Sequence, residues 1–310
     1  MKKFSNKILI IVLVALVAIF ALSRIFRSPK LESNLRKELV KIDTATVTEV
    51  RINREADGGG EVRLKRDGNT WKVTTDNKEA EAGVGAVKSM LGVMKDLQAQ
   101  RMVARKKEKW DSYQVGESST RVTAYNGSEK LADFRVGKTG FSQGQGGGQG
   151  SAYTYLRLTD EDEVYSSEGF ITSHFNRSFD DWRNQMFLKT NRDDVTKIEF
   201  NYPDSSFVLE KRDSLWYVGS EPAIETKVNQ YFSKIRVKTI SEFDDNFVPP
   251  GNATLRIQIS GAGPLATAQA WAMDDENWVL NSTVQQGVYF KGKRSGVLKD
   301  IFVGKGWFIE

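Results

Sequence analysis

The sequence predicts an α+β protein: an N-terminal transmembrane helix followed by two repeated lobes, each made of antiparallel strands and a packed helix. Three observations lead to this fold class. An uninterrupted apolar run covers Ile8–Leu22. Residues 39–52 align without a gap to residues 187–200. After each aligned segment, apolar residues first alternate as in strands and then recur at helical spacing.

The apolar run is the first element. Fifteen residues rise about 22 Å as a helix, which is less than a hydrocarbon core of about 30 Å. With Ile25 and Phe26 included, and with the basic flanks extending to the headgroups, residues 8–26 are long enough to span. A cleaved signal peptide is the alternative, but with Ala21, the best candidate, at position −1 of the cleavage site, the bulky Ile19 falls at position −3. We therefore expect an uncleaved signal anchor.

The flanks of the run predict its orientation. A tail of residues 1–7 precedes the span, and a juxtamembrane linker of residues 27–41 follows it, with basic residues on both sides. A short tail before a first apolar segment usually stays in the cytoplasm, and the rest of the chain is exported. We expect a single pass through the inner (cytoplasmic) membrane, with the bulk of the chain extracytoplasmic and the bilayer as a partner through residues 8–26.

The aligned segments begin two similar lobes. Three aligned pairs are identical: Lys41 and Lys189, Val47 and Val195, Thr48 and Thr196. A turn, a return strand, a second turn and a strand with a tryptophan follow in both copies. Trp71 and Trp216 hold the equivalent positions, and we expect buried core anchors rather than sugar-stacking platforms.

Each copy then changes to helical spacing before a second set of strands. The helical residues are Val84, Val87, Met90, Leu91, Met94 and Leu97 in the first copy, and Ile224, Val228, Tyr231, Phe232 and Ile235 in the second. We place the first lobe at residues 42–186 and the second at residues 187–310. Apolar residues at helical spacing from Ile171 to Met186 predict an amphipathic helix that connects them.

Composition excludes several classes of function. The 310 residues carry 45 basic and 40 acidic side chains. The basic excess lies in residues 1–41, and the rest of the chain is near neutral, so we expect no nucleic-acid partner. The chain has no Cys, which excludes disulfides and thiolate metal sites, and its single His excludes a His-rich metal cage.

The candidate chemical motifs each have a simpler interpretation. The Gly/Gln-rich segment 140–150 lacks the pattern of a phosphate-binding loop and is expected as a flexible surface loop. The acidic runs Asp160–Glu163 and Asp274–Asn277 lack the spacing of a calcium loop and are expected as hairpin turns. Ser173 and Ser178 lie near His174, but nothing supplies the third member of a catalytic triad or a nucleophile elbow. We therefore assign no catalytic, cofactor-binding or metal-binding residue and expect a protein that is not an enzyme.

Several short motifs resemble a known family. They are the N-terminal run, Trp71, Phe134–Lys138, Asp181–Asn184, Met186–Lys189, Val195–Ile198 and Trp216. Over residues 40–300 they look like the domain-of-unknown-function family 4340, from which this chain departs in its insertion at 140–150. The resemblance implies a membrane-anchored, duplicated protein, often encoded beside ABC transporter subunits of the gliding-motility type, with no established active site.

Three functions follow as hypotheses. The first is an exported, anchored accessory or substrate-engaging component of an ABC-type transport complex, with the permease and the ATPase as partners. The second is a stand-alone cell-envelope scaffold or assembly factor. The third is an enzyme that acts on envelope polymers. The sequence contains no Walker motif, so ATP hydrolysis would belong to a partner.

Overall fold

The computed structural model describes residues 13, 16, 36–54, 60–142 and 150–310. The predicted tail, nearly all of the predicted span at 8–26 and much of the linker lie outside these residues, as do residues 143–149 of the Gly/Gln-rich segment. Among the residues that are described, no helix is both long and apolar enough to cross a membrane.

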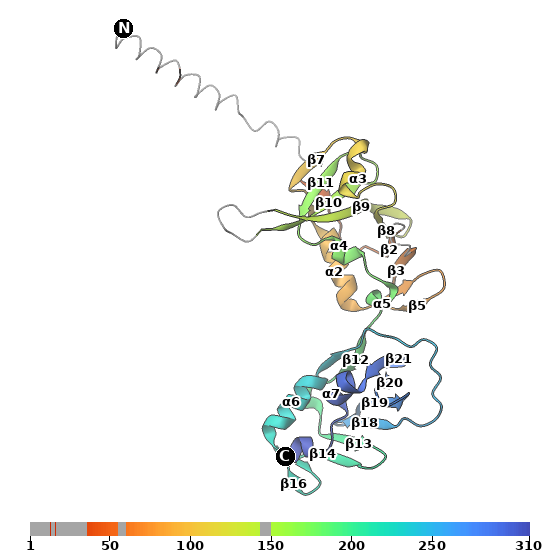
Figure 1. Ribbon diagram of the computed structural model, residues 1–310, viewed down its shortest axis with the longest axis vertical. Coiled ribbons are helices and arrows are strands. Elements are labelled where there is room, and N and C mark those ends of the chain that lie inside the picture. Colours follow the sequence, from red (N-terminus) through yellow and green to blue (C-terminus); the bar gives the residue numbers. More distant parts are fainter. Residues whose placement is uncertain (1–12, 14–15, 17–35, 55–59, 143–149) are drawn as a thin grey trace. The chain divides into compact units, whose positions relative to one another are not determined.

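Strands dominate the fold, and helices are fewer, so the predicted α+β class is confirmed (Figure 1). The chain divides into two compact units. Unit 1 takes the described residues up to 54 and those from 90 to 176, and unit 2 takes residues 60–89 and 177–310. The predicted lobe boundaries at 42–186 and 187–310 remain predictions.

The structure contains two large sheets. The first has nine strands in the order β5 (Glu79–Glu81), β4 (Thr70–Thr74), β3 (Glu61–Asp67), β2 (Glu49–Asn53), β8 (Thr120–Asn126), β9 (Glu129–Phe141), β10 (Ala152–Leu158), β11 (Val164–Glu168) and β7 (Arg101–Ala104). The second has eight strands in the order β16 (Glu221–Pro222), β15 (Leu215–Val218), β14 (Phe207–Arg212), β13 (Lys197–Asn201), β18 (Leu255–Ser260), β19 (Pro264–Ala272), β20 (Asn277–Ser282) and β21 (Gln285–Lys293).

The two sheets repeat one strand order. The first eight strands of the nine-stranded sheet correspond, position by position in chain order, to the eight strands of the second. Two small ribbons repeat as well: β1 (Glu38–Val40) pairs with β6 (Leu97–Gln98), and β12 (Met186–Lys189) pairs with β17 (Val237–Thr239). This is the arrangement that the aligned sequence segments predict. The edge strand β7 has no counterpart in the second sheet, and the sequence analysis did not predict it.

A helix follows the first hairpins in each copy. α2 is Val84–Lys95 and α6 is Glu225–Ile235. In α2 the buried side chains are Val87, Met90 and Met94, and in α6 they are Val228, Tyr231, Phe232 and Ile235. Both sets lie three or four residues apart, so one face of each helix is buried, as the helical spacing predicts. One residue separates each helix from the strand that follows it, β6 or β17.

The predicted connecting helix from Ile171 to Met186 is wrong. The structure has two short helices instead, α4 (Thr172–Phe175) and α5 (Phe179–Trp182). Asn176 leaves helical geometry with φ −82° and ψ 67°. Ser178 then starts α5 with a capping box, because its hydroxyl accepts from the Asp181 N–H and Asp181 accepts from the Ser178 N–H. Apolar residues at the predicted spacing, Ile171, Phe175 and Trp182, are buried, but the capping box starts a separate helix within the segment. Met186 lies in β12.

The two tryptophans differ in burial. Trp216 is 2% exposed and packs on Phe232 of α6 with ring centroids 5.2 Å apart. Trp71 is only half-buried, and the Arg66 guanidinium lies 5.1 Å from its ring. The prediction of a buried core anchor is therefore confirmed for Trp216 and wrong for Trp71. Leu91 takes the place of Phe232 in the alignment of the two helices, so a smaller side chain stands where Trp216 finds its ring partner.

The C-terminal residues complete the core of unit 2. After β21 come η5 (Arg294–Leu298), α7 (Lys299–Ile301) and α8 (Gly306–Ile309), which the sequence analysis did not predict. α6 lies beside α7 (Figure 1). The buried Tyr231 hydroxyl donates to the Ile301 carbonyl at 2.8 Å, and the Tyr202 hydroxyl donates to the Val303 carbonyl at 3.0 Å. Burial raises the pKa of both phenols, so both stay protonated donors.

A buried arginine connects two loops of unit 1. Arg157 on β10 is 1% exposed, and its guanidinium lies 3.6 Å from the centre of the Trp110 ring in α3 (Trp110–Tyr113). It donates to the carbonyls of Val115, Thr159 and Glu161 at 3.0, 3.1 and 3.1 Å. Arg157 thereby connects the loop before β8 to the turn after β10.

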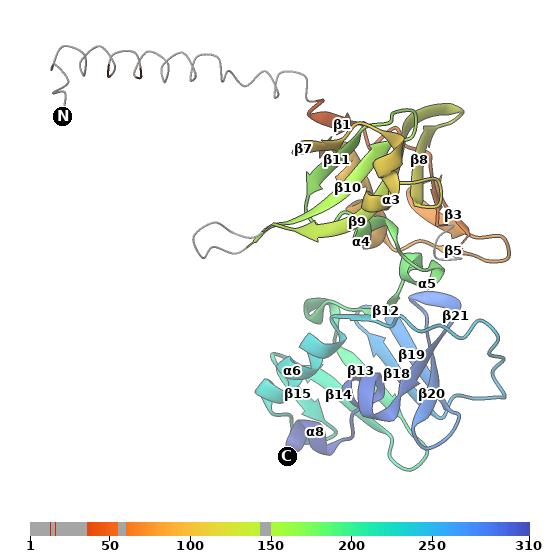
Figure 2. The same cartoon turned by 45° about the horizontal axis from the view of Figure 1, so that its top comes forward.

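In both views the hairpin of β9 and β10 extends from the rest of the sheet (Figures 1 and 2).

Candidate functional site

A pocket lies in unit 2 where one chain segment passes between two sheets. Thr239 ends β17 opposite Met186 of β12, and the next residue donates its N–H to the Gln185 carbonyl. Three residues further on, Phe243 forms an isolated antiparallel bridge with Phe290 of β21. The segment therefore leaves the small ribbon and joins the edge of the large sheet, and the space at this fork is the pocket. We call it the fork pocket.

Backbone bonds fix the segment against β21. The Asp244 N–H donates to the Tyr289 carbonyl at 2.9 Å, and the Lys291 N–H donates to the Glu242 carbonyl at 2.9 Å. Phe243 is buried and stacks near Phe290 with ring centroids 5.1 Å apart. Side chains alternate along an extended chain, so Glu242 and Asp244 point away from the face that Phe243 buries.

The same alternation places two lysines of β21 on the face that Glu242 and Asp244 share. Phe290 is buried, and Lys291 and Lys293 are exposed on the opposite face of β21. Gly292 lies between them and faces the core, where a Cβ atom would come within 2.3 Å of the Leu280 Cδ1 atom. A larger residue between the lysines would have to displace the Leu280 and Val297 side chains, so glycine lets β21 pack closely on the residues beneath it.

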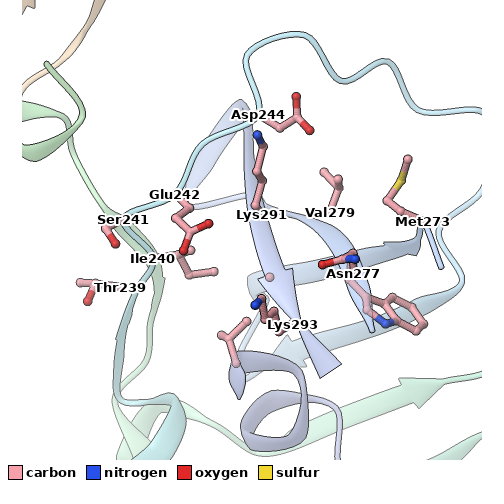
Figure 3. A pocket seen from close by; sticks show the side chains of 13 residues that line it. Thr239, Ile240, Ser241, Glu242, Asp244, Met273, Asn277, Val279, Lys291 and Lys293 are labelled. Atoms are coloured by element: carbon pink, nitrogen blue, oxygen red, sulfur yellow. The ribbon is translucent and has the colours of Figure 1, made fainter. Parts of the chain in front are cut away.

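The fork pocket has a volume of about 440 Å³. Figure 3 shows Glu242 and Asp244 from the segment after β17, and Lys291 and Lys293 from β21, around the hollow. Its remaining lining residues are Thr239, Ile240, Ser241, Met273, Asn277, Trp278, Val279, Gly292 and Val297. Small-molecule sites typically have volumes of about 300–1,000 Å³ with a few polar groups over apolar walls. The fork pocket has this size and this composition.

One wall residue carries a donor without an acceptor. Trp278 is 8% exposed, and within the described chain its indole Nε1 is buried with no hydrogen-bond partner. A buried N–H without an acceptor costs about 1–3 kcal/mol. The nitrogen has almost no accessible surface, so it does not face the space of the pocket.

The acidic turn Asp274–Asn277 borders the pocket. The Asn277 side-chain amide and backbone N–H both donate to Asp274, at 2.8 and 2.7 Å, and these bonds lower the pKa of Asp274. Hydrogen bonds from the Ser295 side chain and backbone lower the pKa of Glu276, and Lys293 adds a smaller electrostatic contribution. The prediction of a hairpin turn is confirmed here, between β19 and β20; Asp274 is held by the turn itself, and Glu276 is held by Ser295 of η5.

The other sequence candidates lie away from the fork pocket. Asp160–Glu163 forms the turn between β10 and β11, as predicted, and Glu161 pairs with Arg36. His174 lies on α4 and lines a smaller hollow beside α2. The described residues contain no group of three or more His, Cys, Asp or Glu side chains placed to hold a metal ion.

The fork pocket was not predicted from the sequence. Its available signal was a pair of short polar–apolar–polar patterns, Glu242-Phe243-Asp244 and Lys291-Gly292-Lys293. Such patterns predict half-buried strand segments, but they do not predict that two of them lie side by side.

The fold and the pocket define a double-sheet α+β protein with a ligand-sized hollow. The model of a family described as a domain of unknown function (DUF4340) matches residues 73–247. This is more than half of the chain, so the chain belongs to that family. The match includes the segment Thr239–Asp244 of the fork pocket and ends before β21. No curated protein and no solved structure matches this chain.

Proposed function

We propose that this protein is a membrane-anchored, extracytoplasmic accessory or substrate-engaging component of an ABC-type transport complex, and that it acts by binding rather than by catalysis. The apolar run Ile8–Leu22 with its basic flanks supports the anchor and the export of the remaining chain. The resemblance to membrane-anchored proteins encoded beside ABC transporter subunits supports the setting.

We infer the binding role from the fork pocket. Its charged side chains come from two adjacent chain segments, and apolar residues such as Val279 and Ile240 also line it. This arrangement supports recognition of a ligand.

The test is affinity purification of the full chain from native membranes. We expect a polytopic permease and an ATPase to co-purify. A matched variant replaces Ile8–Leu22 with an unrelated apolar sequence of equal length, which separates anchoring as such from specific contact within the membrane. A reporter active only outside the cytoplasm, fused after Glu310, should be active.

Two results would reject the proposal. A silent reporter contradicts the export of the chain. Recovery of envelope proteins without any permease or ATPase contradicts the transport setting and favours a stand-alone envelope scaffold or assembly factor.

One observation in unit 1 favours this second function. Phe141 is 69% exposed and Phe170 is 54% exposed, and their ring centroids lie 5.8 Å apart. Exposed aromatic side chains that lie together are typical of protein-binding surfaces. Replacing both with Ser should release a protein partner without changing the melting temperature, and the identity of the released partner distinguishes the transport role from the scaffold role.

A further inference from the structure

Unit 1 repeats the fork that forms the pocket of unit 2. The Ile240 N–H donates to the Gln185 carbonyl in unit 2, and the Ala99 N–H donates to the Lys37 carbonyl at 2.6 Å in unit 1. Lys37 and Gln185 both lie two residues before the aligned sequence segments, so the two bonds are equivalent. Beyond its bond, each segment leaves its small ribbon and joins the edge of a large sheet, in unit 1 as β7 beside β11 (Figures 1 and 2).

A hollow of about 330 Å³ lies at this fork in unit 1. Val93 of α2, Leu97 of β6, Glu168 of β11 and Phe170 line it, and we call it the β11 hollow. Leu97 is buried and Val93 is half-buried, so much of the wall is apolar. Its volume is at the lower end of the range of about 300–1,000 Å³ for small-molecule sites, and it suits one large side chain.

The charges around the β11 hollow are of both signs. Asp96, Glu168 and His174 line it, and Arg101 begins β7 opposite Ser166 of β11. Net charge therefore does not select an occupant, and the selection depends on main-chain hydrogen bonds and apolar surface.

The end of β11 turns main-chain groups toward the open edge of the sheet. The Gly169 N–H donates to the Ala152 carbonyl at 2.8 Å. Hydrogen-bonded and non-hydrogen-bonded positions alternate along antiparallel strands, so Glu168 turns its N–H and C=O away from β10. β7 covers this edge only as far as Arg101, opposite Ser166. In the part of the chain that the structure describes, no strand pairs with Glu168 on that side.

Exposed aromatic surface continues from the hollow. Phe170 lines the hollow and is 54% exposed, and its ring contacts that of Phe141 at the end of β9. A chain that pairs with Glu168 would therefore have apolar surface next to it on unit 1.

We propose that the end of β11 binds a short extended segment of a partner protein, which exchanges main-chain hydrogen bonds with Glu168 and places one apolar side chain in the β11 hollow. Main-chain bonds at a sheet edge give such a complex its affinity, and a pocket for a side chain gives it specificity. A small molecule without a peptide backbone would use the hollow but not the open edge. This inference goes beyond the proposed function, in which the binding role belongs to the fork pocket of unit 2.

Fluorescence anisotropy with the full chain in lipid nanodiscs tests the proposal. The probes are labelled, end-blocked peptides with Phe, Leu or Ser at the centre between pairs of threonines. We expect the Phe and Leu peptides to bind at least about tenfold more tightly than the Ser peptide, because their central side chain enters an apolar hollow. Backbone N-methylation at one position should weaken binding about threefold to tenfold, and at the two adjacent positions should leave it unchanged, because adjacent N–H groups of a strand point to opposite sides.

Variants of the chain assign the binding to the edge and to the hollow. Glu168→Pro removes the N–H at the open edge without removing a bond to β10, and it should weaken binding about threefold to tenfold. Glu168→Gln keeps this N–H and is its control, with unchanged affinity expected. Val93→Phe fills the hollow and should remove the preference for Phe over Ser. Its matched control is Val84→Phe, because Val84 is 71% exposed on the same helix and does not line the hollow.

The peptide series keeps the test independent of the folding of any variant, which melting temperatures report. Equal affinity for the Phe, Leu and Ser peptides would overturn the proposal, as would equal sensitivity to N-methylation at adjacent positions, or a Val93→Phe variant that behaves as Val84→Phe. Self-association of the full chain that Glu168→Pro abolishes would assign the edge to a second copy, and this result too would overturn it. Co-purification with the permease and the ATPase is measured separately, so the proposed function can succeed when peptide binding fails.

Discussion

The buried guanidinium of Arg157 should contribute to stability mainly through its bonds to carbonyl oxygens. The side chain is 1% exposed and donates to the carbonyls of Val115, Thr159 and Glu161. Arg157→Met keeps much of the volume but leaves these acceptors without their donor. Each unsatisfied buried acceptor costs about 1–3 kcal/mol, and the loss of one partner in a buried charged network costs about 3–5 kcal/mol. We expect Arg157→Met to lower the free energy of unfolding by about 3–5 kcal/mol.

Glu117 provides the matched comparison. It pairs with Arg157 at 3.2 Å, but its side chain is 66% exposed. Water screens an ion pair of this kind, so Glu117→Gln should cost no more than about 1 kcal/mol. Arg157→Lys keeps the charge but loses the planar fork that reaches several carbonyls, so it should cost nearly as much as Arg157→Met.

Urea denaturation of the full chain in detergent, followed by tryptophan fluorescence, measures these differences. Trp110 stacks on Arg157 and reports on unit 1. A loss for Glu117→Gln as large as that for Arg157→Met would show that the ion pair dominates. A nearly normal Arg157→Lys variant would show that charge matters more than the carbonyl bonds. Either result refutes the reasoning.

Two further predictions concern burial and pH. Trp216→Ala should cost about 3–5 kcal/mol, and Trp71→Ala clearly less, because Trp71 is half-buried; equal losses in urea denaturation would contradict this. Burial opposes ionisation of Asp133, but hydrogen bonds from Arg121, Lys130 and Thr159 outweigh it and hold its pKa well below the usual value. A depressed pKa stabilises the fold above the unfolded value near 4, and this stability is lost as pH falls below it. The urea midpoint should therefore fall less between pH 5 and pH 2.5 in Asp133→Asn than in the wild type, and parallel curves would reject this assignment.

The sequence predicted elements best where local patterns decide them. The alternation in Glu49–Asn53 and Lys197–Asn201 and the helical spacing in α2 and α6 each depend on residues close in the chain. The alignment of residues 39–52 with 187–200 also placed β1 with β12 and β2 with β13 in corresponding positions. The helical spacing wrongly predicted one continuous helix over Ile171–Met186, because the capping box of Ser178 and Asp181 starts a new helix there.

Burial and the candidate site depended on partners that are distant in sequence. Trp71 and Trp216 have the same local pattern, but only Trp216 has an aromatic partner in its helix. Residues 294–309 carry no clear period, and their place in the core follows from contacts such as Tyr231 with Ile301, which are 70 residues apart.

By itself, the sequence determined the α+β class, the repeated order of strands and helix, and the absence of cysteine chemistry. These follow from side-chain period and composition, which are properties of neighbouring residues and of counts. Only the tertiary structure decided that Glu242 and Asp244 lie beside Lys291 and Lys293 at one hollow. That juxtaposition depends on where the segment after β17 leaves its ribbon and joins β21, and two residues some fifty positions apart carry no local mark of the backbone bonds that bring them together.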